Sequence, residues 1–277
     1  MKQGQPLRAE LAAVARQLHA NGWVANHDGN VTARDGAVFV GTQTATSKRL
    51  ITDRALITID AKGQVVGSGK AFGELGLHLT VYQRRPDVHA VVHAHPPHAT
   101  AISAARVNPI ETPFIAEALV SLGPKIPRLA YAHPGDAARA VLAPWCELVD
   151  GVLLGNHGVL TWGTDLEQAY LRMEVIEHLA KIAIAAAPLG GVEPLPADAI
   201  PPLLAARAKA NIGRAADRAV ETASQLLTPS GPARVMPVVA CAPAPHSTTP
   251  TISHSGSRTA DLADLVREEI VNALRSR

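Results

Sequence analysis

The sequence predicts an α/β protein with a mixed or antiparallel sheet that helices cover on both faces. Two hairpin signals support this prediction, an Asp-Gly pair at 35–36 and a Lys-Gly pair at 62–63, each between short strand-like segments. Helical and strand-like segments then alternate along the middle of the chain. A long helical pattern over residues 165–187 is available to cover the sheet.

The first third of the chain begins with a helix, which the Asn-Gly pair at 21–22 is expected to end. Two hairpins follow, because strand-like residues flank both turn signals. The expected segments are, in order, a helix (7–20), a polar turn (26–30), paired strands (31–34 and 37–40), a hydroxyl-rich loop (42–48) and a second strand pair (57–60 and 64–66).

The stretch 74–98 combines a helix with a strand. Its first half has helical spacing up to Pro86, whose ring blocks continuation. Its second half alternates as a strand does, so that Val88 is expected on one face with Ala90, and His93 on the other with His95.

The following segments complete the predicted sheet and its helical cover. Helices are expected at 98–105, 113–122 and 135–142, strands at 152–154 and 159–162, and the long helix at 165–187. Thr164 is the expected N-cap of that helix, with Glu167 three residues later. Between the last two strands, residues 155–158 read Gly-Asn-His-Gly, which predicts a tight turn.

Composition favours a soluble cytoplasmic protein without affinity for nucleic acid or membranes. The 26 Lys and Arg residues are balanced by 24 Asp and Glu, and no basic patch stands out. Cys146 and Cys241 cannot form a disulfide framework and fit a reducing compartment. The N-terminus lacks the apolar core of a signal peptide, and the apolar run at 182–189 is too short to span a bilayer.

A metal centre is the main chemical prediction. His93 and His95 project from one face of one strand, two residues apart, so both imidazoles can bind a single ion. His157, in its tight turn, is the third candidate ligand, and Glu74 would complete the site or act beside it as a base. Neutral imidazoles suit zinc or another borderline divalent ion such as Mn²⁺, Co²⁺ or Fe²⁺. Of the other histidines, His78 and His98 are the two to examine further.

Three motifs resemble the class II aldolase/adducin family. They are GNVTAR (29–34), GELGLHLTVYQRRPDVHAVVHAHPPHATAIS (73–103) and LLGNHGVLTWGTDLEQAYLRMEVIEHLAKI (153–182). The resemblance implies a three-layer α/β/α sandwich, a homotetramer with active sites between subunits, and a small-molecule substrate. It implies that His93, His95 and His157 bind a divalent metal, and that Glu74 ligates the ion at rest and is the acid/base of aldol cleavage.

Glu117 is a second carboxylate of interest. In the dehydratase and epimerase branches of the family, an acidic residue at a similar distance beyond the histidine pair serves a neighbouring active site. Apolar residues surround Glu117 in the sequence, which predicts a buried carboxylate with a raised pKa. The alternative is a solvated helix residue.

The resemblance is weaker at the residues that bind phosphate in the family. Gly29 and Asn30 match, and Thr44 and Gly73 are the nearest counterparts of two further positions. However, Phe72 stands with Gly73 where family members have a serine pair, and Ala45 follows Thr44 where a glycine is expected. The alternatives are an unphosphorylated substrate, a substrate carboxylate in that pocket, or an anion bound through other contacts, for which Thr44, Thr46, Ser47 and Lys48 are available.

The C-terminal region has a different composition from the catalytic region, expected at 1–227. Residues 228–258 are rich in Pro, Ser, Thr and Ala and predict a linker, and residues 259–277 predict an amphipathic helix. This combination resembles the encapsulation peptides that bring enzymes into bacterial microcompartments, where shell proteins would be the partner. The alternative is a helix that docks on its own oligomer.

The leading functional prediction is a metal-dependent lyase that cleaves a small hydroxy-carbonyl compound by a retro-aldol reaction through a metal-stabilised enediolate. The first alternative is a decarboxylase, dehydratase or epimerase that uses the same metal enediolate with Glu117 as the proton carrier. The second is a non-catalytic scaffold like the adducin branch.

Overall fold

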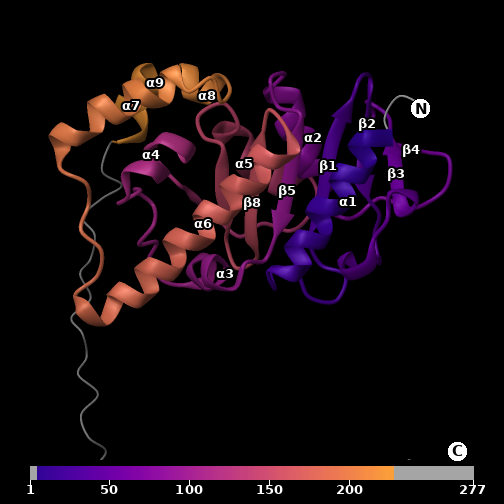
Figure 1. Ribbon diagram of the computed structural model, residues 1–277, viewed down its shortest axis with the longest axis horizontal. Helices are drawn as coiled ribbons and strands as arrows, with labels where there is room; N and C mark the ends of the chain where they lie inside the picture. The colour runs from indigo at the N-terminus through magenta and orange to yellow at the C-terminus, as the bar shows by residue number, and fades with distance from the viewer. Residues whose placement is uncertain (1–4, 228–277) are drawn as a thin grey trace, which may run out of the picture. The chain divides into compact units, whose positions relative to one another are not determined.

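The computed structural model of the protein describes residues 5–227. Its centre is an eight-stranded mixed sheet with the strand order β4-β3-β2-β1-β5-β8-β7-β6 (Figure 1). The strands are β1 (Asn30–Asp35), β2 (Val38–Thr42), β3 (Leu56–Ile59), β4 (Val65–Val66), β5 (Ala90–Ala94), β6 (Arg128–Leu129), β7 (Gly151–Leu154) and β8 (Gly158–Gly163).

All neighbouring strands are antiparallel except β6 and β7. The two predicted hairpins pair β1 with β2 and β3 with β4. β5 lies between β1 and β8, so that His93 is opposite Asn30 on one side and Leu160 on the other. This register places the central histidine strand beside the polar turn that precedes β1.

Helices pack on both faces of the sheet, as predicted. α1, α3 and α6 contribute to one apolar core, and α2 and α5 contribute to the other (Figure 1). The helices are α1 (Gln5–Ala20), α2 (Leu75–Arg84), α3 (Pro97–Ala104), α4 (Ala116–Leu122), α5 (Asp136–Leu142), α6 (Leu166–Ala186), α7 (Ile200–Lys209), α8 (Arg214–Asp217) and α9 (Ala219–Leu226). The α/β/α sandwich around a largely antiparallel sheet is therefore confirmed.

Several local predictions were wrong. Val88 belongs to the opposite core from Ala90, because its amide bonds to Arg85 O in a turn and strand alternation begins only at Ala90. The N-cap of α6 is Asp165, not Thr164: its carboxylate accepts from the Gln168 amide at 2.7 Å.

Element boundaries also differ from the predictions. α4 begins at residue 116 instead of 113. The sequence interpretation missed the short strand β6 and the helices α7 to α9. β6 has two residues and α8 has four, which is too short to show a period. The predicted linker at 228–258 and the amphipathic helix at 259–277 lie outside the described residues.

A buried charge cluster joins three helical segments to the sheet. Asp150, immediately before β7, is fully buried and contacts Arg85 and Arg172 at 3.1 Å, and also Arg207. Arg207, from α7, donates further hydrogen bonds to carbonyl oxygens at the end of α4. Burial alone would raise the pKa of Asp150, but the charges of Arg172, Arg207 and Arg85 lower it below its ordinary value.

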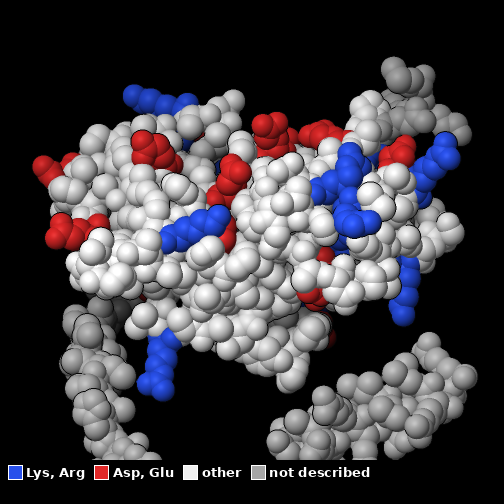
Figure 2. Space-filling view, turned by 60° about the horizontal axis from the view of Figure 1, so that its bottom comes forward, with Lys and Arg blue, Asp and Glu red and all other residues white. Residues whose placement is uncertain are grey.

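The surface in Figure 2 shows acidic and basic side chains interspersed, with broad uncharged areas between them. None of the helices within residues 5–227 is both long and apolar enough to cross a membrane.

Candidate metal centre

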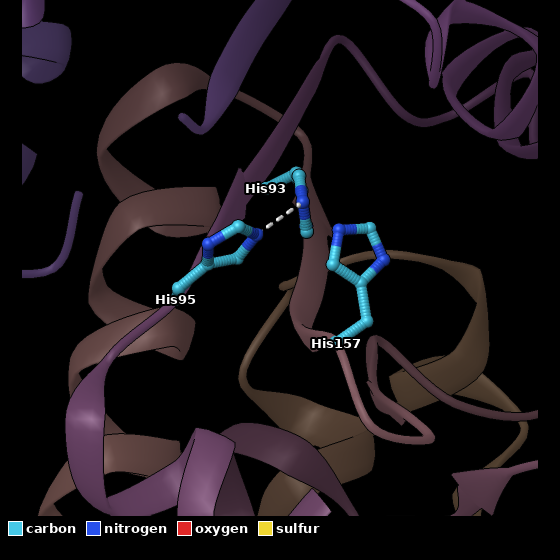
Figure 3. A group of neighbouring side chains, drawn as sticks. All are labelled: His93, His95 and His157. Carbon is cyan, nitrogen blue, oxygen red and sulfur yellow. Dashed lines mark hydrogen bonds between the residues drawn. The ribbon is translucent and has the colours of Figure 1, made fainter. Parts of the chain in front are cut away.

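Three histidines from two parts of the sheet converge at one point (Figure 3). His93 is in β5, His95 follows the end of that strand, and His157 lies in the turn between β7 and β8. One nitrogen from each ring can be chosen such that all three lie within 4.8 Å of one another. The structure thus brings together the three residues that the sequence suggested as ligands.

The turn that carries His157 is fixed by close packing. Asn156 has a left-handed φ of 57°, and the His157 amide donates to Leu154 O at 3.0 Å. Gly158 follows, and a Cβ atom added there would lie 2.6 Å from Ala94 O and 2.7 Å from the His95 ring. Only a glycine lets the turn approach β5 so closely, which sets His157 beside the other two rings.

The His93 ring is held in one tautomer. His93 is 1% exposed, and its Nδ1 lies 2.9 Å from the carbonyl oxygen of Val159. Because a carbonyl only accepts hydrogen bonds, Nδ1 carries the proton, and the neutral ring keeps a lone pair on Nε2. That lone pair faces the other histidines.

The environment favours the neutral form of His93 and His95. Burial lowers the pKa of His93 well below its ordinary value, and the neighbouring His95 and His157 lower it further. Burial also lowers the pKa of His95, together with His157, although Asp28 and Glu74 oppose the shift. Neutral imidazole is the form that ligates metals.

The spacing of the rings fits a divalent ion. His93 Nε2 and His95 Nε2 are 3.2 Å apart. Two nitrogens that ligate one tetrahedral zinc ion at about 2.0–2.1 Å lie roughly 3.3 Å apart. Three imidazole ligands would leave a bound ion its full charge, and three protein ligands with an open position are typical of catalytic zinc sites.

Glu74 lies beside this cluster as the N-cap residue of α2. One carboxylate oxygen is 4.0 Å from His157 Nε2, and the other accepts a hydrogen bond from Asn30 Nδ2 at 3.2 Å. The carboxylate is partly exposed, with a quarter (25%) of its side chain accessible. It is therefore both oriented and open to a bound molecule.

A cavity of about 240 Å³ opens next to Glu74 and His157. Gly73 lines it together with Leu77 and Tyr131. A larger cavity, of about 480 Å³ and lined by Asn21, Trp23 and residues of α6, contains none of the predicted site residues. The smaller cavity is the one that adjoins the histidine cluster.

The other predicted substrate residues are Gly29, in the turn before β1, Asn30, the first residue of β1, and Thr44, in the loop after β2. Gly29 has a left-handed φ of 70° and packs against the carbonyl of His93, and Asn30 is 4% exposed. The Thr44 amide donates a hydrogen bond to Lys70 O at 3.1 Å. Thr44 does not line the cavity beside Glu74. Ala45 adopts a φ of 53°, so the backbone keeps a glycine-like conformation although the residue is alanine.

Glu117 does not share the cavity that Glu74 and His157 line. It is exposed on α4, at a shallow hollow of about 510 Å³ that Val120, Leu203 and Ile212 also line. The predicted buried carboxylate is therefore wrong for this chain. Apolar neighbours in sequence, including Ala118 and Leu119, turn inward and leave Glu117 on the outer side of the helix.

The two further histidines have different surroundings. His78 is fully buried, and its Nδ1 lies 2.8 Å from Thr32 Oγ1. His98 Nδ1 lies 2.7 Å from the buried carboxylate of Glu177, which also accepts from the Ala99 amide at the start of α3. Both have well-defined partners away from the ring cluster.

Sequence interpretation missed Asp28, whose carboxylate lies 3.7 Å from His95 Nδ1. Its position in the polar turn beside Gly29 and Asn30 was the available signal.

Comparisons with known proteins extend these observations. Relatives include an L-fuculose phosphate aldolase of Methanococcus maripaludis, 33% identical over 174 residues that span 62% of this chain and 93% of the relative. A 3-oxo-tetronate 4-phosphate decarboxylase of Cupriavidus necator is 29% identical over 180 residues, which span 64% and 82%.

Solved structures of related proteins share the fold. The crystal structure of YgbL from Escherichia coli, described as a putative aldolase/epimerase/decarboxylase, superposes with a TM-score of 0.66 at 27% identity over 73% of this chain and 99% of that one. The profile of the family described as Class II Aldolase and Adducin N-terminal domain matches residues 9–184. With its sandwich fold and its histidine cluster, this chain belongs to the class II aldolase/adducin family.

Proposed function

We propose that the protein is a metal-dependent lyase that cleaves a carbon–carbon bond in a small hydroxy-carbonyl compound by a retro-aldol reaction. The observation that carries the proposal is the cluster of His93, His95 and His157 with the carboxylate of Glu74 alongside it. The alternative of a non-catalytic scaffold has no need of three converging imidazoles.

The three histidines would hold a divalent ion, with zinc as the preferred one and Mn²⁺, Co²⁺ or Fe²⁺ as substitutes. A bound ion supplies Lewis acidity toward the substrate's carbonyl oxygen, where negative charge develops when the bond breaks. His93 would be the most rigid ligand, since it is buried and bonded to Val159 O. His95 and His157, whose side chains are 27% and 33% exposed, would border the open side.

Glu74 would move the proton. In retro-aldol cleavage a base removes the proton of the β-hydroxyl group, the carbon–carbon bond breaks, and its electron pair moves toward the carbonyl. A proton must then reach the new carbanion carbon, and a carboxylate beside the site can deliver it. The hydrogen bond from Asn30 holds Glu74 in place, which supports this role.

The proposed substrate is small and polar at one end. The cavity beside Glu74 has a volume of about 240 Å³, with Leu77, Tyr131 and Ala138 among its lining residues. Asn30 Oδ1 is buried without a hydrogen-bond partner in the described part of the chain and could accept from a substrate hydroxyl. Gly29, Asn30, Thr44 and Gly73 are proposed to bind the substrate, whether or not it carries phosphate.

A decarboxylase, dehydratase or epimerase is the second candidate. The observation that favours it is the decarboxylase relative, together with the exposed position of Glu117. In a homotetramer, which we propose for this chain, Glu117 would face the metal centre of a neighbouring subunit and carry a proton there.

A substrate screen tests these proposals. The zinc-loaded full chain is incubated with phosphorylated and free hydroxy-ketones and β-keto acids, and products are identified by NMR. The lyase proposal expects two carbonyl products, and Glu74→Gln should reduce turnover by about 10²- to 10⁴-fold. Full turnover by Glu74→Gln, with loss only in Glu117→Gln, would instead assign the proton to the second carboxylate. Glu10→Gln, on the exposed side of α1, is the matched control.

We also propose a cytoplasmic location, and encapsulation in a microcompartment through residues 259–277, which lie outside the described residues. A fluorescent protein fused to residues 228–277 should form foci in cells that make shells and should co-purify with shell proteins. Diffuse fluorescence without co-purification would remove the encapsulation proposal and leave the catalytic one intact.

A further inference from the structure

The turn before β1, residues 25–29, lies directly against the strand that carries two of the histidines. Trp23, just before the turn, accepts a hydrogen bond from the His95 amide at 2.8 Å. At the other end, a Cβ atom added to Gly29 would lie 3.0 Å from the His93 carbonyl oxygen. A shift of this turn would therefore displace the strand segment that carries His93 and His95.

Asp28, on this turn, faces the nitrogen of His95 that points away from the cluster. Its Oδ2 lies 3.7 Å from His95 Nδ1, while His95 Nε2 lies 3.2 Å from His93 Nε2. His93 Nε2 carries a lone pair, because Nδ1 of the same ring donates its proton to Val159 O. Without a metal, His95 Nε2 can donate to that lone pair. A cation bound there instead would leave the His95 proton on Nδ1, where the Asp28 carboxylate lies 3.7 Å away.

Lys48 holds the same turn from the other side. Its side chain is 2% exposed, and its Nζ donates to His27 O at 2.8 Å and to Thr46 O at 3.1 Å. These two carbonyls belong to the turn at 25–29 and to the loop at 44–48. The ammonium group is thus a buried tie between two segments that have no strand pairing with each other at this point.

Lys48 keeps most of its charge at neutral pH although it is buried. Burial lowers its pKa to about 8, while the negative charges of Asp28 and Glu74 oppose that shift. The group stays mostly protonated at neutral pH, so both hydrogen bonds persist. Since Lys48 is buried and bonded to carbonyls, it is a poor direct contact for a substrate anion, contrary to the sequence expectation.

We propose that Asp28 and Lys48 are positioning residues of the metal centre: Asp28 orients His95 with Nε2 toward the ion, and Lys48 fixes the turn that carries Asp28. The inference rests on the proposed function only in assigning an ion to the three histidines. A carboxylate that orients a ligating histidine typically changes metal affinity ten- to a hundredfold.

Zinc affinity of the full chain, measured by competition with a chromophoric chelator, tests the role of Asp28. Asp28→Asn should weaken zinc binding by about ten- to a hundredfold. Asp35→Asn, a half-buried carboxylate at the far end of β1, is the matched control and should bind zinc like the wild type. Wild-type affinity in Asp28→Asn would overturn the proposal. No zinc binding by the wild type would instead contradict the proposed function.

Lys48 is tested through its dependence on Asp28. Lys48→Met should weaken zinc binding about as much as Asp28→Asn, and Lys48→Arg, which keeps a charged donor, should restore most of it. The double variant should bind zinc no more weakly than Asp28→Asn alone, because both act through one imidazole. Multiplied losses in the double variant would assign Lys48 a separate role and contradict the inference. Lys62→Met, on an exposed hairpin, is the control.

A spectroscopic measurement distinguishes a loss of His95 orientation from a general loosening of the histidine cluster. In the zinc-loaded wild type, ¹H–¹⁵N spectra should show a proton on His95 Nδ1 with slow solvent exchange. In zinc-loaded Asp28→Asn that proton should exchange faster, while the Nδ1 proton of His93, bonded to Val159 O, should be unchanged. Equal acceleration at both rings would indicate a loosened site and overturn the orienting role of Asp28.

Discussion

His93 Nδ1 donates a hydrogen bond of 2.9 Å to the carbonyl oxygen of Val159 on the neighbouring strand β8. The backbone carbonyl of Val159 thereby sets the tautomer of the His93 ring. It leaves the lone pair of Nε2 directed at the point where His95 and His157 also meet. The arrangement of the histidine cluster thus depends on the register of β5 against β8.

Gly158 should be essential for the third ligand. In Gly158→Ala the new Cβ would lie 2.6 Å from Ala94 O, so the turn must move away from β5 and take His157 with it. We expect zinc affinity to fall at least tenfold, measured by chelator competition. Gly36→Ala is the control, since its Cβ meets no atom within 4 Å and the turn is distant from the histidines. Unchanged zinc affinity in Gly158→Ala would show that the turn tolerates displacement.

Asp150 should matter for stability and not for metal binding. Asp150→Asn removes the charge that three buried arginines share, which should cost about 3–5 kcal/mol in the free energy of unfolding. Urea unfolding followed by circular dichroism measures this. Asp136→Asn, which loses only an exposed ion pair with Arg139, should change stability by less than about 1 kcal/mol. Equal effects of the two substitutions would contradict the importance of the buried cluster.

His78 should make the metal-free protein less stable as the pH falls. Burial lowers its pKa to about 3, well below the ordinary value near 6.5. Below that ordinary value the unfolded chain binds a proton that the folded chain does not, so stability decreases by about 1.4 kcal/mol per pH unit. In His78→Phe the slope between about pH 6 and 4 should be shallower by that amount. Parallel stability curves from urea unfolding would show that His78 is protonated in the folded state.

Much of the fold followed from local signals. The hairpins at 35–36 and 62–63 and the end of the helix before Pro86 depend on turn residues and backbone sterics, which the sequence displays directly. The histidine spacing gave the approximate position of the cluster for a similar reason, because side chains two residues apart on a strand share a face.

Other features depend on contacts between distant segments, which no local pattern displays. Glu117 was expected to be buried because its neighbours are apolar, but the orientation of α4 against the rest of the fold leaves it outside. Likewise, Lys48 looks like a surface residue of a polar loop, and only the three-dimensional structure brings its ammonium to the carbonyl of His27.

The most direct test of the central claim is the zinc content of the protein. Full-length chain purified without chelator is measured by inductively coupled plasma mass spectrometry after addition of zinc and desalting. The metal centre described here predicts about one zinc ion per chain, and close to none in a variant with His93, His95 and His157 all replaced by alanine. Zinc retained by that triple variant at the wild-type level, or absent from the wild type, would contradict the assignment of this site.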